Sequence, residues 1–459
     1  MNKVNNILNV GIIIVFAGIV ILLSFGTMIS APSTNKIRGV DMTTPDFKQL
    51  SYYEKAVLIR KQCMKRLENT VYMDYATESL FSENQISEFA DDLQKNLYGN
   101  THSESPSSEL SSEVVESLRK HILEFFGTTI SDYSVVFTYS HAQALKVVAE
   151  AFPFDQKSCF YMAESSSNNI LGLRGFAKEK MANVDNFLIE NTDSLSFQEN
   201  STNLISLPLM NEFDGSVLSD VEISKIIGAQ SENVFTLVDA SLYTTVRKLN
   251  LKNTPFSAVA ISFDRLFGYP NIGAALIHNS FIKRLQRPYF GGGTLVYALT
   301  KSNYEKLRIK PSEKFEDGSL PFLSICSLKY GFSQFEHLGW EDIHAHIEKM
   351  GSILRTKIGN IRYLNGSPAT KVYGKESVSI ITFSIIDKNG KLLDLDQLIK
   401  SAKSKGIIFS SGCMSTPVSC IKQIGDENTK GAIRLSIGWV TTNDDIDYVV
   451  SFIQSQITE

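Results

Sequence analysis

Short, uninterrupted apolar runs constrain the fold of this 459-residue chain more than any other feature. Polar or turn-forming residues bound each run, so each one reads as a strand. Strands that are apolar at consecutive positions are typical of a mostly parallel sheet covered on both faces. The runs are "SVVFT" (134–138), "CFYMA" (159–163), "NLISLPL" (203–209), "FTLVDA" (235–240), "AVAISF" (258–263) and "GAALIHN" (273–279).

Amphipathic segments alternate with these runs. Apolar residues recur four apart over 109–126, just before Gly127, which predicts a helix that ends at the glycine. Further helices are expected over 141–152 and near 168–180. This alternation predicts an α/β large domain with a mostly parallel central sheet over residues 65–325.

The pattern changes beyond residue 325. A helix is expected near 341–360 and a terminal helix from Asn443, with three apolar runs between them. These runs are "SVSIITFSII" (377–386), "GIIFSSG" (406–412) and "AIRLSIGWV" (432–440). We therefore expect a smaller α+β domain over 326–459, with residues 36–64 packing on it.

The amino-terminal segment differs from the rest of the chain. Residues 10–29 contain no charged side chain, and twenty helical residues span roughly 30 Å, the thickness of a bilayer's hydrocarbon core. We interpret residues 1–35 as a single-pass membrane anchor and linker. A cleaved signal peptide is the main alternative. The charges on the two flanks of the apolar segment nearly balance. The sequence therefore predicts neither which membrane holds the anchor nor on which side of it the folded domain lies.

Composition argues against two classes of site. The formal net charge is −4, which does not predict nucleic-acid binding. The five cysteines are scattered and form no CxxC pair, so neither a disulfide framework nor a metal site is expected.

Several stretches, in order along residues 70–450, resemble the amino-terminal, cysteine desulfurase-like region of the molybdenum cofactor sulfurase family. That region belongs to the class V aminotransferase superfamily. The resemblance implies a type I pyridoxal phosphate (PLP) fold, often a dimer with its site at the subunit boundary. The stretches are "VYMDYAT" (71–77), "YGNTHSESPSSEL" (98–110), "ALKVVAEAFPF" (144–154), "VDA" (238–240), "ISFDRLFGYPNIGA" (261–274), "YFGGGT" (289–294), "FEDGSLPFLSICSLKYGF" (315–332) and "SGC" (411–413).

The resemblance assigns three positions around the cofactor ring. Asp239 matches the aspartate that charges the pyridine nitrogen, although it could equally cap the turn that follows its strand. Arg265 takes the place of the lysine that forms the Schiff base, and a permanently protonated guanidinium cannot form one. Ser167 takes the place of the histidine that stacks on the ring.

The resemblance also assigns positions at the cofactor phosphate. Ser140, His141 and Ala142 replace the family's glycine and Ser-Thr turn, and a Cβ hinders close backbone approach to a phosphate. His141 could donate to an anion, but a helix-start or solvent-facing role fits it better. Thr294 ends the GGGT segment, which in the family can help to hold the neighbouring subunit's phosphate; a flexible turn is the alternative.

The substrate side is altered as well. Ser415 stands where the family has its sulfur-accepting cysteine, and a serine hydroxyl cannot carry a persulfide. Cys413, two residues away, is a weak substitute, since a free cysteine packed as a small hydrophobe is the simpler interpretation. Arg434 matches an arginine that can bind a substrate carboxylate, or is a paired strand arginine. Met210 replaces a family glutamine.

Two functional hypotheses follow. The first is a membrane-anchored pseudoenzyme that serves as a binding, scaffold or regulatory subunit, as a homodimer or with another protein. No catalytic residue is then expected, and PLP is not bound covalently. The second is a divergent enzyme that holds PLP or another phosphorylated ligand through Arg265 and Asp239 without a Schiff base. In the first hypothesis, Arg265 fills the former cofactor space and pairs with Asp239.

Overall fold

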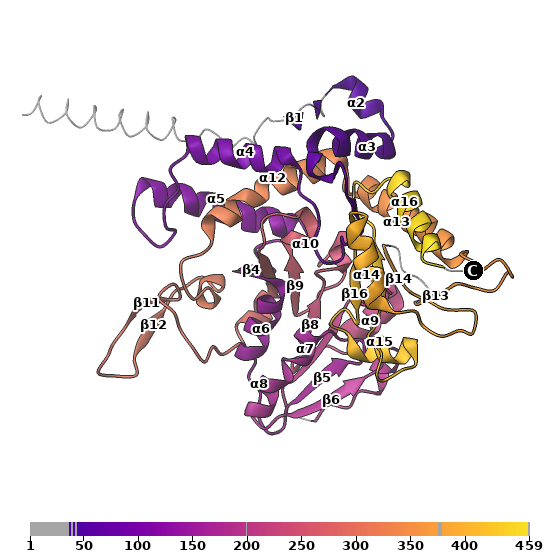
Figure 1. Cartoon of the computed structure of the whole chain (residues 1–459). Coiled ribbons are helices and arrows are strands. Elements are labelled where there is room, and N and C mark those ends of the chain that lie inside the picture. Colours follow the sequence, from indigo (N-terminus) through magenta and orange to yellow (C-terminus); the bar gives the residue numbers. More distant parts are fainter. Residues whose placement is uncertain (1–35, 38–39, 42–43, 199, 375–378, 458–459) are drawn as a thin grey trace, which may run out of the picture.

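A seven-stranded mixed sheet lies at the centre of the computed structural model, which describes residues 36–37, 40–41, 44–198, 200–374 and 379–457. The strand order is β4-β10-β9-β8-β7-β5-β6 (Figure 1). The strands are β4 (Tyr133–Thr138), β5 (Cys159–Ala163), β6 (Asn183–Phe187), β7 (Asn203–Pro208), β8 (Val234–Asp239), β9 (Ala258–Ser262) and β10 (Gly273–His278). Each of the six predicted apolar runs forms one of these strands.

Strand direction explains where the sheet's loops gather. β9, β8, β7, β5 and β6 form parallel pairs, whereas β10 runs antiparallel to both β4 and β9. The sheet is therefore mostly parallel with one reversed strand. The carboxyl ends of β4, β7, β8 and β9 lie on one edge, which is where open α/β sheets place their ligand sites.

The two faces of the sheet pack into two separate hydrophobic cores. Along β9, Val259 and Ile261 join one core, while Ala258 and Ala260 join the other. This alternation follows from the two-residue period of a strand, and burial on both faces accounts for the continuous apolar runs. Helix α6 (His141–Ala151) covers one face, and α5 (Pro106–Phe125) packs on β4 and on α12 (Phe322–Leu338).

A second, antiparallel sheet forms the smaller unit, in the order β13-β14-β17-β16. Its strands are β13 (Thr370–Val372), β14 (Ile380–Ile385), β16 (Ser410–Gly412) and β17 (Ala432–Ser436), and α13 (Trp340–Gly359) and α16 (Asn443–Ser455) pack beside it. Helix α3 (Tyr52–Cys63) contacts α13, and the Tyr52 hydroxyl donates to the Trp439 carbonyl at 3.1 Å.

The remaining elements are shorter or peripheral. The β11–β12 hairpin projects from the body of the molecule (Figure 1). These elements are β1 (Lys36–Ile37), β2 (Val40–Asp41), α2 (Pro45–Gln49), η1 (Lys65–Leu67), β3 (Val71–Tyr72), α4 (Glu83–Lys95), α7 (Asn168–Leu171), α8 (Arg174–Glu179), η2 (Ile189–Ser194), α9 (Asp220–Gly228), η3 (Tyr243–Thr245), α10 (Phe263–Phe267), α11 (Asn279–Ile282), β11 (Leu295–Ala298), β12 (Glu305–Leu307), η4 (Ser312–Phe315), α14 (Leu395–Ser404), β15 (Ile407–Ile408) and α15 (Pro417–Ile424).

The predicted helices over 109–126, 141–152 and 341–360 are confirmed, whereas the one near 168–180 is two short helices, α7 and α8. The run at 406–412 divides between two sheets, because β15 pairs with β3 and β16 with β17. No helix among the described residues is both long and apolar enough to cross a bilayer. Residues 10–29 lie outside the described part of the chain, so the membrane anchor stays a prediction.

Candidate functional site

The loops at the carboxyl edge of the central sheet bring together residues from four strands. Asp239 ends β8, and its carboxylate accepts hydrogen bonds from the Ser241 amide at 3.0 Å and from the Ser241 hydroxyl at 2.6 Å. Asp239 is 5 % exposed. The predicted turn-capping role of Asp239 is therefore present, and the Ser241 hydroxyl is free to accept a further bond.

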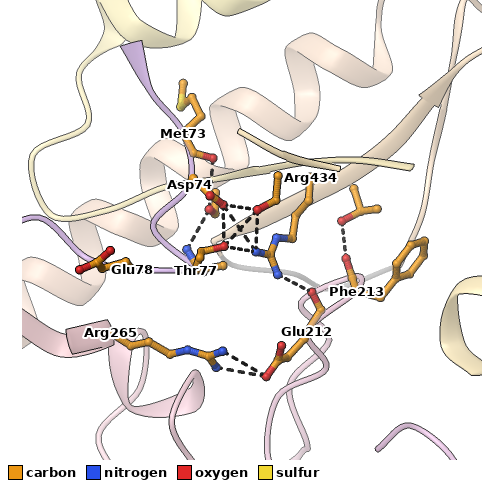
Figure 2. A network of polar contacts seen from close by, with 12 residues as sticks. Met73, Asp74, Thr77, Glu78, Glu212, Phe213, Arg265 and Arg434 are labelled. Carbon is orange, nitrogen blue, oxygen red and sulfur yellow. Dashed lines mark hydrogen bonds and ion pairs between the residues drawn. The ribbon is translucent and has the colours of Figure 1, made fainter. Parts of the chain in front are cut away.

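Arg265, on α10, donates to that hydroxyl. Its Nη1 lies 3.0 Å from Ser241 Oγ and 3.2 Å from Glu212 Oε1, and its Nη2 lies 3.3 Å from the same Glu212 oxygen. Figure 2 shows the guanidinium directed at Glu212. Both side chains are nearly buried, 9 % and 12 % exposed. The predicted pairing of Arg265 with Asp239 is wrong in detail, because its ion-pair partner is Glu212 and Ser241 bridges it to Asp239.

Charge balance explains why a buried arginine is stable here. Burial alone would lower the pKa of the Arg265 guanidinium, but the Glu212 and Asp239 carboxylates outweigh burial and hold the pKa above its usual value. Arg265 also lines a cavity of only about 20 Å³ between Tyr75, Leu242 and Trp439. That volume admits about one water molecule, and neither Glu212 nor Asp239 lines the cavity.

Local backbone geometry fixes the position of α10. This five-residue helix ends at Gly268, which adopts the left-handed φ of 73°. A Cβ at Gly268 would lie 2.5 Å from the Ser79 carbonyl oxygen and the Phe81 amide nitrogen. Only glycine accommodates both the backbone angle and this close approach. The segment 79–81, which follows β3, therefore holds the end of α10 and, with it, Arg265.

Both terminal nitrogens of Arg434, on β17, also have partners within the chain. Its Nη1 donates to the Glu212 carbonyl at 2.9 Å, and its Nη2 donates to Thr77 Oγ1 at 2.8 Å and Ser410 Oγ at 3.3 Å (Figure 2). Asp74 Oδ1 lies 3.5 Å from Nη2. Burial lowers the pKa of Arg434 despite these partners. Of the two predicted roles, a paired strand arginine fits this geometry, because chain atoms occupy both terminal nitrogens.

The turn after β4 contributes Ser140 and His141. Ser140 caps α6, its hydroxyl accepting from the Gln143 amide at 3.2 Å, while the Gln143 side chain accepts from the Tyr139 amide at 2.8 Å. His141 Nε2 lies 3.2 Å from Asn169 Nδ2. Of the amides that an anion could bind at this helix start, that of Gln143 thus already has a partner within the chain.

His141, Glu212 and Asp239 form a polar group at the centre of the site. One ligand atom from each lies within 4.8 Å of the others. Imidazole and carboxylate groups are ligands for divalent metals. However, Arg265 shares Glu212 and places a permanent positive charge beside the group, which opposes the binding of a cation.

Ser167 and Ser415 lie on two segments that a backbone hydrogen bond joins. Ser167 precedes α7 and is 1 % exposed, and the Ser415 carbonyl accepts from the neighbouring Asn168 amide at 2.7 Å. Met414 and Ser415 both have left-handed φ angles, 49° and 57°. These angles are unusual for residues with a Cβ, so the 413–416 turn is held in a strained form.

Cys413 does not pack as the free cysteine that the sequence suggested. It forms a disulfide with Cys420, with Cα atoms 5.2 Å apart. The strained turn reverses the chain between β16 and α15, and this reversal brings two cysteines seven residues apart into contact. Cys63, Cys159 and Cys326 form no disulfide and are buried.

Thr294 lies in a turn of its own. Its hydroxyl donates to the Gly291 carbonyl at 2.9 Å, and it is 1 % exposed. Met210 follows β7 and is 2 % exposed.

Sequence reasoning missed Glu212 and Ser241. Ser241 could have been found from its place two residues after Asp239, whereas nothing in the loop sequence "PLMNEFDG" singles out Glu212.

These residues do not fit a covalently held PLP. The position that the family resemblance assigns to lysine holds Arg265, and no lysine among the described residues forms an ion pair with Glu212 or Asp239. Asp239 is bonded within the chain, and the helix start that would face a phosphate is capped by its own side chains. We therefore derive no reaction step through this cofactor.

Comparison with known proteins agrees with the fold. The aminotransferase class-V family model matches residues 71–449. Human molybdenum cofactor sulfurase is 30 % identical over 450 residues, which cover 86 % of this chain and 50 % of the human protein. The rice protein of the same name is 28 % identical, and the match covers 85 % of this chain and 56 % of the rice protein. The chain thus spans about half the length of the curated relatives it matches.

Solved structures share the architecture. The cysteine desulfurase CsdA from Escherichia coli superposes with a TM-score of 0.74 at 14 % identity, covering 88 % of this chain and 99 % of that one. The apo cysteine desulfurase from Thermococcus onnurineus superposes with a TM-score of 0.73 at 17 % identity. The match covers 87 % of this chain and 97 % of that one. At such low identity these matches show the fold alone.

Proposed function

Because this chain belongs to the aminotransferase class-V family, we propose that it is a molybdenum cofactor sulfurase-like protein that has lost PLP-dependent catalysis. In this proposal it acts as a binding, scaffold or regulatory subunit. The fold of the family is retained, while the groups that would perform its chemistry are replaced or engaged elsewhere.

The buried Arg265–Glu212 ion pair is the observation that carries the proposal. A Schiff base requires an amine with a free lone pair, and a guanidinium offers none. An active enzyme could tolerate an arginine at this position only if another lysine reached the same space. The contacts of Arg265 with Glu212 and Ser241 support the absence of such a lysine.

Two further positions support the loss of sulfur transfer. Ser415 has no thiol, and the sulfur atom of Cys413 is bonded to Cys420. Arg434, which would bind a substrate carboxylate by family resemblance, donates to Glu212 and Thr77. Three separate steps of one mechanism therefore lack their functional groups, and a single compensating change cannot restore them all.

The geometry argues against the divergent-enzyme hypothesis. That hypothesis needs Arg265 to bind a phosphate, but both of its terminal nitrogens already contact Glu212. A phosphate would have to displace a carboxylate from a nearly buried site. The net energy gained from such an exchange of one anion for another is small.

Assembly and location remain parts of the proposal. By family resemblance the chain forms a homodimer, or a hetero-oligomer with another protein. Residues 10–29 would anchor it to a membrane as a single span. Both features suit a protein whose role is to hold a partner in place.

An assay of cysteine desulfuration tests the proposal. The purified full chain is incubated with PLP, L-cysteine and a reducing agent, and sulfide and alanine are measured. An active cysteine desulfurase processed in parallel serves as the positive control. We expect neither product above the level of a heat-denatured sample. Catalytic release of equal amounts of sulfide and alanine would show that the chain is an enzyme.

A further inference from the structure

The Cys413–Cys420 disulfide joins a half-buried residue to a fully buried one. Cys413 follows the β16 strand and is partly exposed, whereas Cys420 lies on α15 and is 0 % exposed. Thiol–disulfide exchange needs an attacking thiolate to reach one sulfur atom. The two sulfurs therefore differ in the property that decides which of them is attacked.

We propose that Cys413 and Cys420 form a reversible thiol–disulfide exchange site, with Cys413 as the sulfur that an incoming small thiol attacks. This inference is independent of whether the neighbouring site binds PLP. The ligand class is a low-molecular-weight thiol such as a glutathione-type peptide.

The exchange proceeds in two balanced steps. The incoming thiolate bonds to Cys413 Sγ, the Cys413–Cys420 bond breaks, and Cys420 leaves as a thiolate that takes a proton from solvent. A second thiolate then attacks the ligand sulfur of the mixed disulfide and releases the Cys413 thiolate. The protein disulfide is reduced to two thiols, and two small thiols are oxidised to one small disulfide.

The contacts of this loop give the exchange a structural consequence. The left-handed turn at Met414 and Ser415 lies inside the ring that the disulfide closes. Opening the ring allows these residues to return to ordinary backbone angles. The hydrogen bond from the Asn168 amide to the Ser415 carbonyl would then be lost.

A second set of contacts connects the ring to the Arg265 site. Ser419, within the ring, accepts a hydrogen bond from Asn211 Nδ2 at 2.8 Å, and Asn211 Oδ1 accepts from the Phe213 amide at 2.8 Å. Phe213 also packs in one apolar cluster with Cys420. Glu212 lies between Asn211 and Phe213. Reduction of the disulfide therefore loosens the loop that carries the ion-pair partner of Arg265.

Differential alkylation of the full chain tests the site. The oxidised protein is exposed to reduced glutathione under native conditions, samples are quenched with N-ethylmaleimide, and modified cysteines are identified by mass spectrometry. We expect neither Cys413 nor Cys420 to be modified before glutathione is added, and the first species formed afterwards to carry glutathione on Cys413 and not on Cys420. Cys326 is the internal control, since burial raises the pKa of its thiol to about 12.

Two matched variants test which sulfur is attacked. With oxidised glutathione, Cys420→Ser should accumulate one glutathione on Cys413, whereas Cys413→Ser should gain none on Cys420. The position of glutathione in the wild-type mixed disulfide decides the same question if either variant fails to fold. Glutathione in equal amounts on both cysteines, glutathione on Cys420 first, N-ethylmaleimide on either cysteine before reduction, or no modification after glutathione treatment would each overturn the proposal.

Hydrogen–deuterium exchange tests the structural consequence. On reduction, we expect faster exchange at the Asn168 amide and across 413–420, with no change in the central strand β8. Unchanged exchange at Asn168 in the fully reduced protein would contradict the predicted loosening of the loop.

Discussion

Arg265 and Glu212 form an ion pair across the carboxyl edge of the central sheet, with Nη1 and Oε1 3.2 Å apart and both side chains nearly buried. The two residues lie 53 positions apart in sequence. Their contact occupies the position where the family resemblance requires a reactive lysine. In the proposed function, the ion pair gives a structural role to a position that is catalytic in the family.

This ion pair makes Glu212 important for stability. In Glu212→Gln the Arg265 guanidinium stays buried without its main countercharge, so we expect the free energy of unfolding to fall by about 3 kcal/mol. Glu164→Gln is the matched control, because it breaks the exposed ion pair with Lys422 and should cost less than about 1 kcal/mol. Chemical denaturation measures both. Equal losses for the two variants would argue against a structural role for the pair.

The close approach of β16 and β17 predicts that replacing one glycine between them lowers the stability of the protein. Gly431 has a left-handed φ of 96°, and a Cβ there would lie 2.1 Å from the Gly412 carbonyl carbon. We therefore expect Gly431→Ala to destabilise the protein by more than about 1 kcal/mol. Gly292→Ala is the control, since nothing lies within 4 Å of its added Cβ. Thermal melting compares the two, and a Gly431→Ala protein as stable as the control contradicts this packing.

His346 predicts a loss of stability in mild acid. It is 5 % exposed, and burial lowers its pKa from 6.5 to about 4. Between these values the unfolded chain binds a proton that the folded chain does not, so the free energy of unfolding falls as the pH decreases. From pH 7 to pH 5 this residue should account for a loss of about 2 kcal/mol.

The comparison uses His346→Gln, which removes the titrating group. The variant should lose less stability than the wild type between the two pH values, whatever its stability at pH 7. Denaturant titrations at both pH values give the difference. An identical loss in the two proteins would show that His346 does not titrate as expected.

The predicted amino-terminal anchor determines whether the chain is recovered with the membrane pellet or in the supernatant. After alkaline carbonate extraction, we expect the full-length protein to stay in the membrane pellet. A variant lacking residues 10–29 should appear in the supernatant, because it has lost the apolar segment. Immunoblotting of the two fractions distinguishes them. Full-length protein in the supernatant would contradict a spanning helix.

Sequence patterns predicted where the strands end better than they predicted which side chains contact one another. Asp239 and His141, both named from the sequence, lie together in the structure because the strands before them end at a common edge of the sheet. Glu212 was not, since a glutamate in a polar loop carries no signal until the fold brings Arg265 to it. The Cys413–Cys420 bond was missed for a similar reason. A separation of seven residues matches no cysteine motif, and only the left-handed turn at Met414 and Ser415 brings the two sulfurs together.

Borohydride trapping tests the central claim most directly. The purified full chain is incubated with PLP, treated with sodium borohydride, and analysed by intact-protein and peptide mass spectrometry, beside an active cysteine desulfurase. Borohydride fixes a Schiff base as a stable pyridoxyl-lysine. We predict a stoichiometric adduct on the active enzyme and no site-specific adduct on this chain. A stoichiometric pyridoxyl group on one lysine of this chain would contradict the loss of covalent cofactor binding.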